Sequence, residues 1–482
     1  MIDKRLIEEH LRPFITKDSQ IEFRNSSEFA NLNRIDIGIK LFFLKCYEDG
    51  DESRFYIAKA MYLEHIRCFN FGEYFEHGDR SKVSEEDFLD NFISLYHDMK
   101  LHGFNDDKSI VPVSRDQIPI NGSHRIAVAI LLGYKIPTVQ LDLNGTIYGI
   151  NYFRSRQLND VVISTALNNI ISHNDALRVG ILWPASADKE GFIRTSIKHH
   201  FESQEIDLDM NSILNLLTVI YKHEDWMRDS VENSKIDIYN KCFECLGDRR
   251  QSKAFIIFYS EFNQESTLEF KEEIRDIISL GKSSIHMADN ADESIEICDL
   301  LIGEESRFWL KKVDFQAAKG LLMRESANLR KIQSKLGLSF LISGSSFVEF
   351  LGGRRANDID FVDLSVERDV SCHSTEYKRF SLPVPDYKFG LSSRFLFYKY
   401  QFVDFTRIIA LKENRAEPKD ILDLEFLRSV RLDIRPRFHT KIMTVFRYYK
   451  VKSISKCKAV TLNILTDLGL YKLARRLYHF IK

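Results

Sequence analysis

The sequence is poor in the residues that build flexible linkers, with only 9 Pro and 21 Gly in 482 residues. Its domains are therefore expected to abut, and a chain of this length predicts two to four of them. No apolar run approaches the roughly 18 residues of a membrane-spanning helix, and the charged start MIDKRLIEEHLRPFITK lacks the apolar segment of a secretory signal. The 7 cysteines are an odd number, and their one CxxC pair has no second pair at zinc spacing. These absences predict a cytoplasmic protein without a disulfide framework.

The charges that are present are divided unevenly along the chain. From Arg428 to Lys482 there are 14 Lys and Arg against two acids, a net charge of +12 that leaves −14 on the remainder. The end of this stretch, LGLYKLARRLYHFIK, places apolar residues at helical spacing and predicts a basic amphipathic helix. Such a tail either makes peripheral contact with an anionic partner, such as the inner membrane face, or packs on the last domain with its basic face in solvent.

Hydrophobic and polar patterning divides the chain into four regions of a multi-domain α/β and α+β protein. Residues 1–150 hold a helical N-terminal extension and then short strands around the apolar helix IAVAILLG. Residues 175–312 alternate strands such as KAFIIFYS with helices, which suggests a middle domain with an α/β layer structure. Residues 313–430 contain the segment FLISGSSFVEFLGGRRANDIDFVDL and further α+β elements, and residues 431–482 form the predicted basic helical tail.

Two carboxylates, one residue apart, lie in an apolar run near the end of that segment. Asp358 and Asp360 would share one face of a strand, where like charges repel unless a cation lies between them. Oxygen ligands of this kind suit Mg²⁺ or Mn²⁺, bound together with substrate phosphates. Upstream, the glycine of the Gly344-Ser345 turn allows a phosphate to approach the backbone. Asp404, in the later strand YQFVDFTRII, is a third candidate metal ligand.

Arg354 and Arg355 add positive charge just before the acidic pair and are candidates to contact the phosphates. The turn, the acidic pair and the third acid together resemble the nucleotidyltransferase superfamily related to DNA polymerase β. This resemblance covers only the C-terminal region and implies a metal-dependent enzyme that uses a nucleoside triphosphate. The later pattern LKENRAEPKDILDLEFL is similar to the small-molecule and toxin-like branches, in which a Lys (here Lys412 or Lys419) and an Asp (here Asp420) follow the core.

A second glycine turn, Asn121-Gly122-Ser123-His124-Arg125, lies between the short segment IPI and the apolar helix. Amides at the helix start and the Arg125 side chain would bind phosphate there, and His124 is a candidate acid or base. The arrangement resembles ParB nucleotide-binding domains, sulfiredoxin and related small-molecule kinases. In that fold a Gly-x-x-Arg turn holds nucleotide phosphates, which implies that Gly122, Ser123 and Arg125 contact ATP or CTP. The alternative is a helix-capping turn with an incidental His-Arg pair.

The sequence therefore predicts a transferase that moves a nucleotidyl or phosphoryl group from a nucleoside triphosphate to a small or lipid- or polymer-linked acceptor. The arrangement of domains is similar to that of multi-domain proteins of bacterial surface polysaccharide biosynthesis. Two alternatives stay open. One is a nucleic-acid-directed nucleotidyltransferase of the toxin or defence kind, with the basic tail on the phosphate backbone. The other is a non-catalytic, nucleotide-binding regulatory protein.

Overall fold

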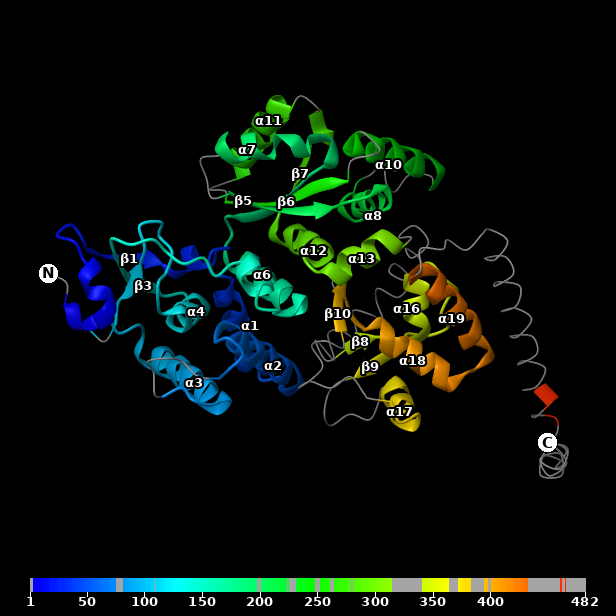
Figure 1. Ribbon diagram of the computed structural model, residues 1–482, viewed down its shortest axis with the longest axis horizontal. Helices are drawn as coiled ribbons and strands as arrows, with labels where there is room; N and C mark the ends of the chain where they lie inside the picture. Colours follow the sequence, from blue (N-terminus) through cyan, green and yellow to red (C-terminus); the bar gives the residue numbers. More distant parts are fainter. Residues whose placement is uncertain are drawn as a thin grey trace.

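The computed structural model places three groups of helices and strands one after another along the chain (Figure 1). Each group contains one small β-sheet, so the protein is a mixed α/β protein with several sheets, as the sequence predicts. The predicted tail at 431–482 lies outside the described residues, apart from Arg431, Val460, Thr461 and Ile464. The structure describes residues 3–74, 81–107, 109–196, 201–222, 224, 231–247, 252–260, 264–278, 281–313, 340–363, 372–382, 394–397, 400–431, 460, 461 and 464.

The N-terminal group holds a three-stranded sheet in the order β1-β3-β2. Strand β2 runs parallel to β3, and helix α4 connects them as a crossover. Gly122 and Gly133 flank α4 with φ angles of 89° and 71°, a region that glycine enters without steric cost. The elements of this group are β1 (Ile21–Asn25), α1 (Ile35–Asp49), α2 (Glu52–Phe69), α3 (Glu85–His102), β2 (Val111–Val113), α4 (Ser123–Leu132), β3 (Lys135–Gln140) and α5 (Ile150–Arg154).

The middle group holds a four-stranded sheet in the order β5-β6-β4-β7. All of its pairings are antiparallel, so the alternation of strands and helices in the sequence does not produce a parallel α/β layer here. Strands β4 and β6 are mostly apolar, and nearly all of their residues are buried. The elements are β4 (Leu177–Leu182), α7 (Glu190–Ser196), β5 (Phe201–Asp207), α8 (Met210–Ile220), α10 (Val231–Leu246), β6 (Lys253–Ser260), α11 (Gln264–Ile278), β7 (Ile285–Met287), α12 (Ala291–Leu301) and α13 (Glu304–Lys312).

The C-terminal group holds a four-stranded mixed sheet in the order β10-β11-β8-β9. Strand β8 runs parallel to β11 and antiparallel to β9, so the end of β8, the end of β11 and the start of β9 lie at the same edge. The elements are β8 (Phe340–Ile342), α16 (Gly344–Phe350), β9 (Phe361–Asp363), α17 (Cys372–Arg379), β10 (Arg394–Phe397), β11 (Tyr400–Val403), α18 (Phe405–Arg415) and α19 (Pro418–Arg431).

Helix α6 (Asp160–His173) joins the three groups. It falls in the stretch between the predicted domains 1–150 and 175–312, and it packs against α1 on one side and α12 on the other, and also touches strand β10. One continuous cluster of buried apolar side chains accordingly runs from the N-terminal group through the middle group into the C-terminal group. Because burial of apolar surface contributes about 25 cal/mol per Å², a shared core of this kind holds the groups together.

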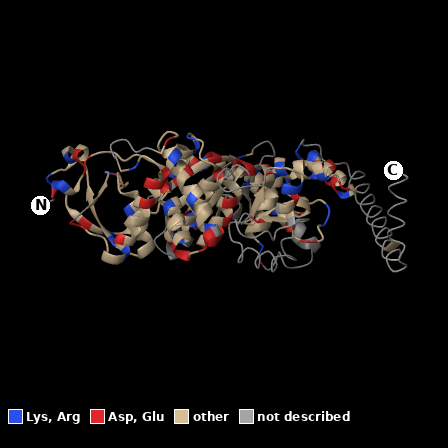
Figure 2. Ribbon diagram, turned by 90° about the horizontal axis from the view of Figure 1, so that it is seen from below, with Lys and Arg blue, Asp and Glu red and all other residues tan. Residues whose placement is uncertain are grey.

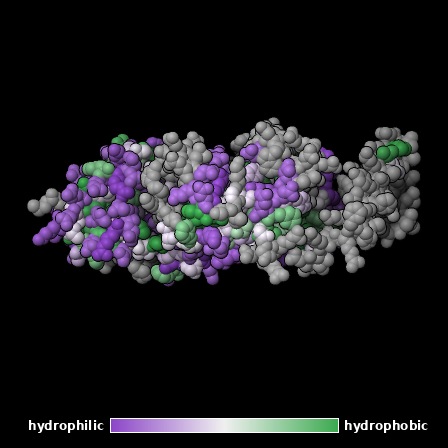
Figure 3. Space-filling view, turned by 90° about the horizontal axis from the view of Figure 1, so that it is seen from above, coloured by the Kyte–Doolittle hydropathy of each residue, from purple (hydrophilic) through white to green (hydrophobic). Residues whose placement is uncertain are grey.

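The surface of the described part is mostly polar. Lys and Arg alternate with Asp and Glu along the face in Figure 2, so neither sign of charge dominates it. Figure 3 shows a predominantly hydrophilic N-terminal part with smaller hydrophobic areas between. None of the described helices is both long and apolar enough to cross a lipid bilayer.

Candidate functional site

Three sequence-predicted features meet at one edge of the C-terminal sheet. Ile342 of β8 pairs with Phe402 of β11 on one side and with Phe361 of β9 on the other. Gly344 therefore lies two residues after Ile342, and Asp404 lies two residues after Phe402. Asp360 lies one residue before Phe361, and because β9 runs antiparallel to β8 it is at the same edge. Neighbouring strands are about 4.8 Å apart, so the backbones at Asp360 and Asp404 are about 10 Å apart, with the glycine turn between them.

Asp360 is the buried member of the acidic pair, with 7% of its surface exposed. The backbone amide and the hydroxyl of Ser345 both donate to its Oδ2. His373 of α17 places Nε2 3.2 Å from Oδ1. Burial alone would raise the pKa of Asp360, but the hydrogen bonds and charge of His373 and Ser345 outweigh it and lower that pKa. Asp360 is thus held as a carboxylate.

Asp358 does not share a strand face with Asp360, which differs from the prediction. Strand β9 begins only at Phe361, and Asp358 lies exposed in the preceding loop. Ser346 fixes this loop, because its hydroxyl accepts from the amide of Asp360 (2.8 Å) and donates to the carbonyl of Asp358 (3.2 Å). The two carboxylates therefore differ in environment, one facing solvent and one facing the sheet edge.

Asp404 lies just beyond β11 and caps helix α18. Its carboxylate accepts from the amide of Arg407 (3.1 Å) and from the guanidinium of Arg407 (2.6 Å). Within the described ranges, no three His, Cys, Asp or Glu side chains are arranged to hold a metal ion. Carboxylates are ligands that Mg²⁺ and Mn²⁺ prefer, but Asp404 is engaged at the helix start, Asp360 has protein partners on both oxygens, and Asp358 faces solvent. The three-carboxylate site therefore stays a prediction.

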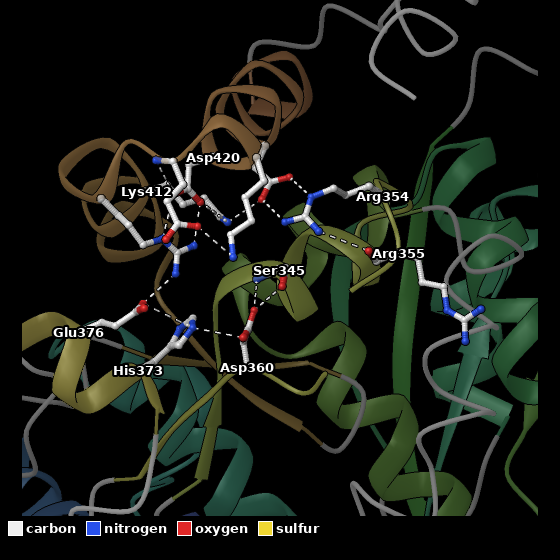
Figure 4. A network of polar contacts seen from close by, with 12 residues as sticks. Ser345, Arg354, Arg355, Asp360, His373, Glu376, Lys412 and Asp420 are labelled. Carbon is white, nitrogen blue, oxygen red and sulfur yellow. Dashed lines mark hydrogen bonds and ion pairs between the residues drawn. The ribbon is translucent and has the colours of Figure 1, made fainter. Parts of the chain in front are cut away.

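A chain of charged side chains extends from Asp360 to the loop that precedes it (Figure 4). His373 lies 3.7 Å from Glu376, and Glu376 accepts from Arg415 (2.8 Å). The chain then continues through helices α18 and α19 and returns to Arg354. Its further links are Arg415 to Asp420 (2.7 Å), Lys412 to Asp420 (3.4 Å), Lys412 to Asp423 (2.7 Å) and Arg354 to Asp423 (2.6 Å).

The network decides between residues that the sequence leaves as alternatives. Lys412 is fully buried within it, whereas Lys419 pairs with Glu417 at the surface. Arg354 is held by Asp423, and Arg355 is exposed and points away from the network in Figure 4. Neither arginine is brought to the Ser345–Asp360 contact, in contrast to the phosphate-binding role predicted for them.

His373, Glu376, Arg415 and Asp423 are site residues that the sequence reasoning missed. His373 lies in the polar stretch CHSTEYKR, which shows no alternation or motif that relates it to Asp360. Glu376 lies in the same stretch. The KENRAEPKDILDLEFL pattern did contain a signal for Arg415 and Asp423. Its charges at Arg415, Asp420 and Asp423 fall where two consecutive helices turn back on each other.

At the N-terminal glycine turn the neighbouring charged group is a cation, Arg125, and not a carboxylate. The Arg125 guanidinium donates to the hydroxyl of Ser109, and it lies beside Gly122, where an added Cβ would come 3.1 Å from Nη2. Burial lowers the pKa of Arg125, and the nearby Glu8 partly offsets this. Asn121 ties the turn down, with its Oδ1 accepting from the Gly122 amide and its Nδ2 donating to Glu8 (both 2.6 Å). Ser123 follows, half-buried, as the first residue of α4.

His124 points into the protein. Its Nε2 is 2.9 Å from the Tyr62 hydroxyl, and its ring meets Phe92 edge to face with centroids 4.6 Å apart. Burial lowers the pKa of His124 well below its usual value, which keeps the imidazole neutral. These contacts fix His124 against α2 and α3, behind the turn that Gly122 and Arg125 form.

Comparison with known proteins adds no further assignment, because no protein-family model, curated protein or solved structure matches this chain. The CxxC pair of the sequence lies on α10. Cys242 and Cys245 are both fully buried, and burial raises the pKa of each thiol to about 12. The candidate functional residues are therefore those of the two glycine turns.

Proposed function

We propose that this protein is a Mg²⁺- or Mn²⁺-dependent nucleotidyl- or phosphotransferase that uses a nucleoside triphosphate and a small or lipid- or polymer-linked acceptor. The observation that carries the proposal is the strand register in the C-terminal sheet. It brings the Gly344-Ser345 turn, Asp360 and Asp404 to one edge from three separate parts of the chain. Open sheets place their ligands at such edges, where loops follow the strands.

In this proposal each residue has a role that its surroundings support. Glycine is needed at position 344 because a side chain there would overlap both His373 and Asp360, so this turn packs directly on the pair. Asp358 and Asp360 would hold a divalent cation, which when bound would offset the charge of the phosphates. His373 and Ser345 keep Asp360 ionised and fixed in direction. Asp404 would face the acceptor from the neighbouring strand.

The N-terminal turn supports a second phosphate contact. Arg125 is a half-buried cation whose described partner is the uncharged hydroxyl of Ser109, and a cation with a neutral partner can still bind an anion. Gly122, directly before α4, packs against this guanidinium. We infer that this turn, in the ParB-like region, binds a nucleotide or a phosphorylated substrate, with His124 as a packing residue behind it.

The decisive experiment follows phosphorus from each nucleoside triphosphate, labelled at the α or the γ position, into products. Purified protein with Mg²⁺ or Mn²⁺ would receive a bacterial extract of small molecules and glycolipids in one arm and tRNA in another. We expect α label in an extract product, with release of pyrophosphate, and its loss in Asp360→Asn. Asp188→Asn, an exposed carboxylate of the middle group, is the matched control and should retain activity.

Other outcomes separate the alternatives. Label in tRNA would favour the nucleic-acid-directed enzyme, and transfer of γ label alone, lost in Arg125→Ala, would move the chemistry to the N-terminal turn. A non-catalytic regulatory protein is the second candidate, because both oxygens of Asp360 already have protein partners. Nucleotide binding without transfer of either label would favour that candidate and contradict the enzyme.

A further inference from the structure

A pocket of about 670 Å³ lies where the middle group of elements meets the C-terminal group. Its walls come from the first turns of α6, α13 and α18, from strand β10 and from the end of α19. The volume is within the range of small-molecule sites in proteins. No sequence pattern indicated it, because its walls come from residues 159–164, 303–309 and 394–431, which are far apart along the chain.

Part of the pocket wall is aromatic. Phe308 and Phe405 line it, and Trp309 supports them, with its ring centroid 4.8 Å from that of Phe308 and 5.3 Å from that of Phe405. The Trp309 indole N–H also donates to Glu305 (2.9 Å), which fixes this carboxylate at the rim of the aromatic wall. The pocket therefore places flat apolar surfaces beside a held hydrogen-bond acceptor.

The pocket lining carries charges of both signs, and further arginines lie beside it. Four lining carboxylates face two lining guanidinium groups, and two further arginines pair with the carboxylates from just outside. The carboxylates are those of Asp160, Glu304, Glu305 and Asp404, the lining guanidinium groups those of Arg394 and Arg431, and the outer partners Arg154 (3.7 Å from Asp160) and Arg407 (2.6 Å from Asp404).

We propose that this pocket binds an uncharged, polyhydroxylated ligand of the sugar class. A hydroxyl group both donates and accepts, so it can bond to the carboxylates and to the guanidinium groups in turn. The apolar C–H face of a sugar ring can pack on Phe308, whereas Phe405 is buried with the Arg431 guanidinium over its ring. Because charged groups of both signs line the pocket, a neutral ligand with many hydroxyl groups can bond to each of them without a charge of its own.

The position of the pocket links it to the sheet edge. Asp404 belongs to both, because it follows β11 beside the Gly344-Ser345 turn and also lines the pocket. The assignment of the sugar as the acceptor of the transfer rests on the proposed function, whereas the binding itself does not. In this arrangement the middle group contributes α13 as one wall of the acceptor site.

The test is saturation-transfer NMR on the full chain, with D-glucose, D-galactose, D-mannose and N-acetyl-D-glucosamine supplied separately. D-Glucosamine and glucose 1-phosphate serve as the charged counterparts. We expect saturation of at least one neutral sugar and an affinity at least ten-fold lower in Glu305→Gln. Glu205→Gln, the same change on the exposed ion pair with Lys253, should bind as the wild type does. Phe308→Leu, with its thermal midpoint checked, provides a second variant that should weaken binding.

Saturation of none of the four neutral sugars would overturn the proposal, as would binding unaffected by both Glu305→Gln and Phe308→Leu. Binding of a charged counterpart alone would replace the neutral ligand with an ionic one and equally overturn it. Asp360→Asn separates this proposal from the transfer reaction. If Asp360→Asn abolishes transfer but no sugar binds, the proposed transferase activity is supported and the proposed sugar site is rejected. If a sugar binds but no label is transferred, the sugar site is supported and the transferase activity is rejected.

Discussion

The two glycine turns of this protein share a backbone design and differ in the charge behind it. Gly122 and Gly344 both follow a strand or bridge, adopt positive φ angles (89° and 57°) and stand at the start of a helix. Behind Gly122 lies the cation Arg125, with a hydroxyl partner. Behind Gly344 lies the anion Asp360, held by Ser345 and His373. Each glycine is therefore packed against an ionised side chain, and the sign of that charge differs between the two turns.

Under the proposed function, the two turns would bind phosphate in different ways. Arg125 would contact an anion itself, whereas Asp360 would repel a phosphate unless a cation lay between them. The difference also appears in the supporting residues. Arg125 has few contacts, and these come from residues close to it. Asp360, in contrast, is the end of a chain of charged residues that reaches Arg354 through α17, α18 and α19.

The largest expected effect is on the rate of transfer, which should depend on the Gly344 turn much more than on the Gly122 turn. We expect Asp360→Asn to reduce nucleotidyl transfer by at least about 1,000-fold, or about 4 kcal/mol in activation free energy, because it removes a charge beside the reacting phosphates. We expect Arg125→Ala to leave the rate at saturating substrate within about three-fold and to weaken nucleotide binding to the N-terminal turn about ten-fold. Steady-state kinetics and equilibrium binding of each nucleotide would check this split. Equal losses of rate in both variants would contradict it.

The next effect concerns stability and compares the glycines directly. At Gly344 an alanine would suffer both the positive φ and overlap with His373 and Asp360, so we expect a loss above about 3 kcal/mol in the free energy of unfolding. At Gly122 the added Cβ would meet only the movable Arg125 side chain, at 3.1 Å, and the cost should be about 1 to 2 kcal/mol. Urea unfolding of Gly344→Ala and Gly122→Ala would measure both. Similar losses would show that the crowding around Gly344 relaxes.

Sequence reasoning found the parts of the site that are close together along the chain. The strand, turn, helix and acidic loop from Phe340 to Asp360 are consecutive, so residue type and spacing were enough to predict that Ser345 and Asp360 lie close together. It could not predict partners that arrive from elsewhere. Arg354 was predicted to contact phosphate because its charge suits that role, but Asp423, 69 residues later, binds it instead.

The same limit applies to the sheets and to the pocket. Apolar runs predicted strands β4 and β6, but the direction of each pairing depends on how distant strands meet, and all pairings in that sheet are antiparallel. Glu305 and Asp404 line one pocket although nearly 100 residues separate them along the chain. No local periodicity or motif predicts this proximity, because it results from the packing of α13 against the C-terminal sheet.

The smallest predicted effect is a difference in pH dependence between the two turns. Burial lowers the folded-state pKa of His124, so below the unfolded value of about 6.5 the unfolded chain binds a proton that the folded chain does not. Stability should then fall as the pH decreases, by up to about 1.4 kcal/mol per pH unit for this one group. The pKa of Asp360 is also lowered, but its contribution is present above the unfolded value of about 3.9 and is lost only below it.

The two turns should therefore respond in separate pH windows. Urea unfolding of wild type, His124→Gln and Asp360→Asn at pH 7, 6, 5 and 3.5 would show this as differences between each variant and the wild type. From pH 7 to 5 the stability lost on His124→Gln should shrink, because the wild type loses the histidine term that the variant lacks. The loss on Asp360→Asn should shrink at pH 3.5, where the carboxyl of the unfolded chain binds a proton. A constant loss for His124→Gln would mean that this imidazole is protonated freely in the folded protein, and that the turn behind Gly122 is open to water.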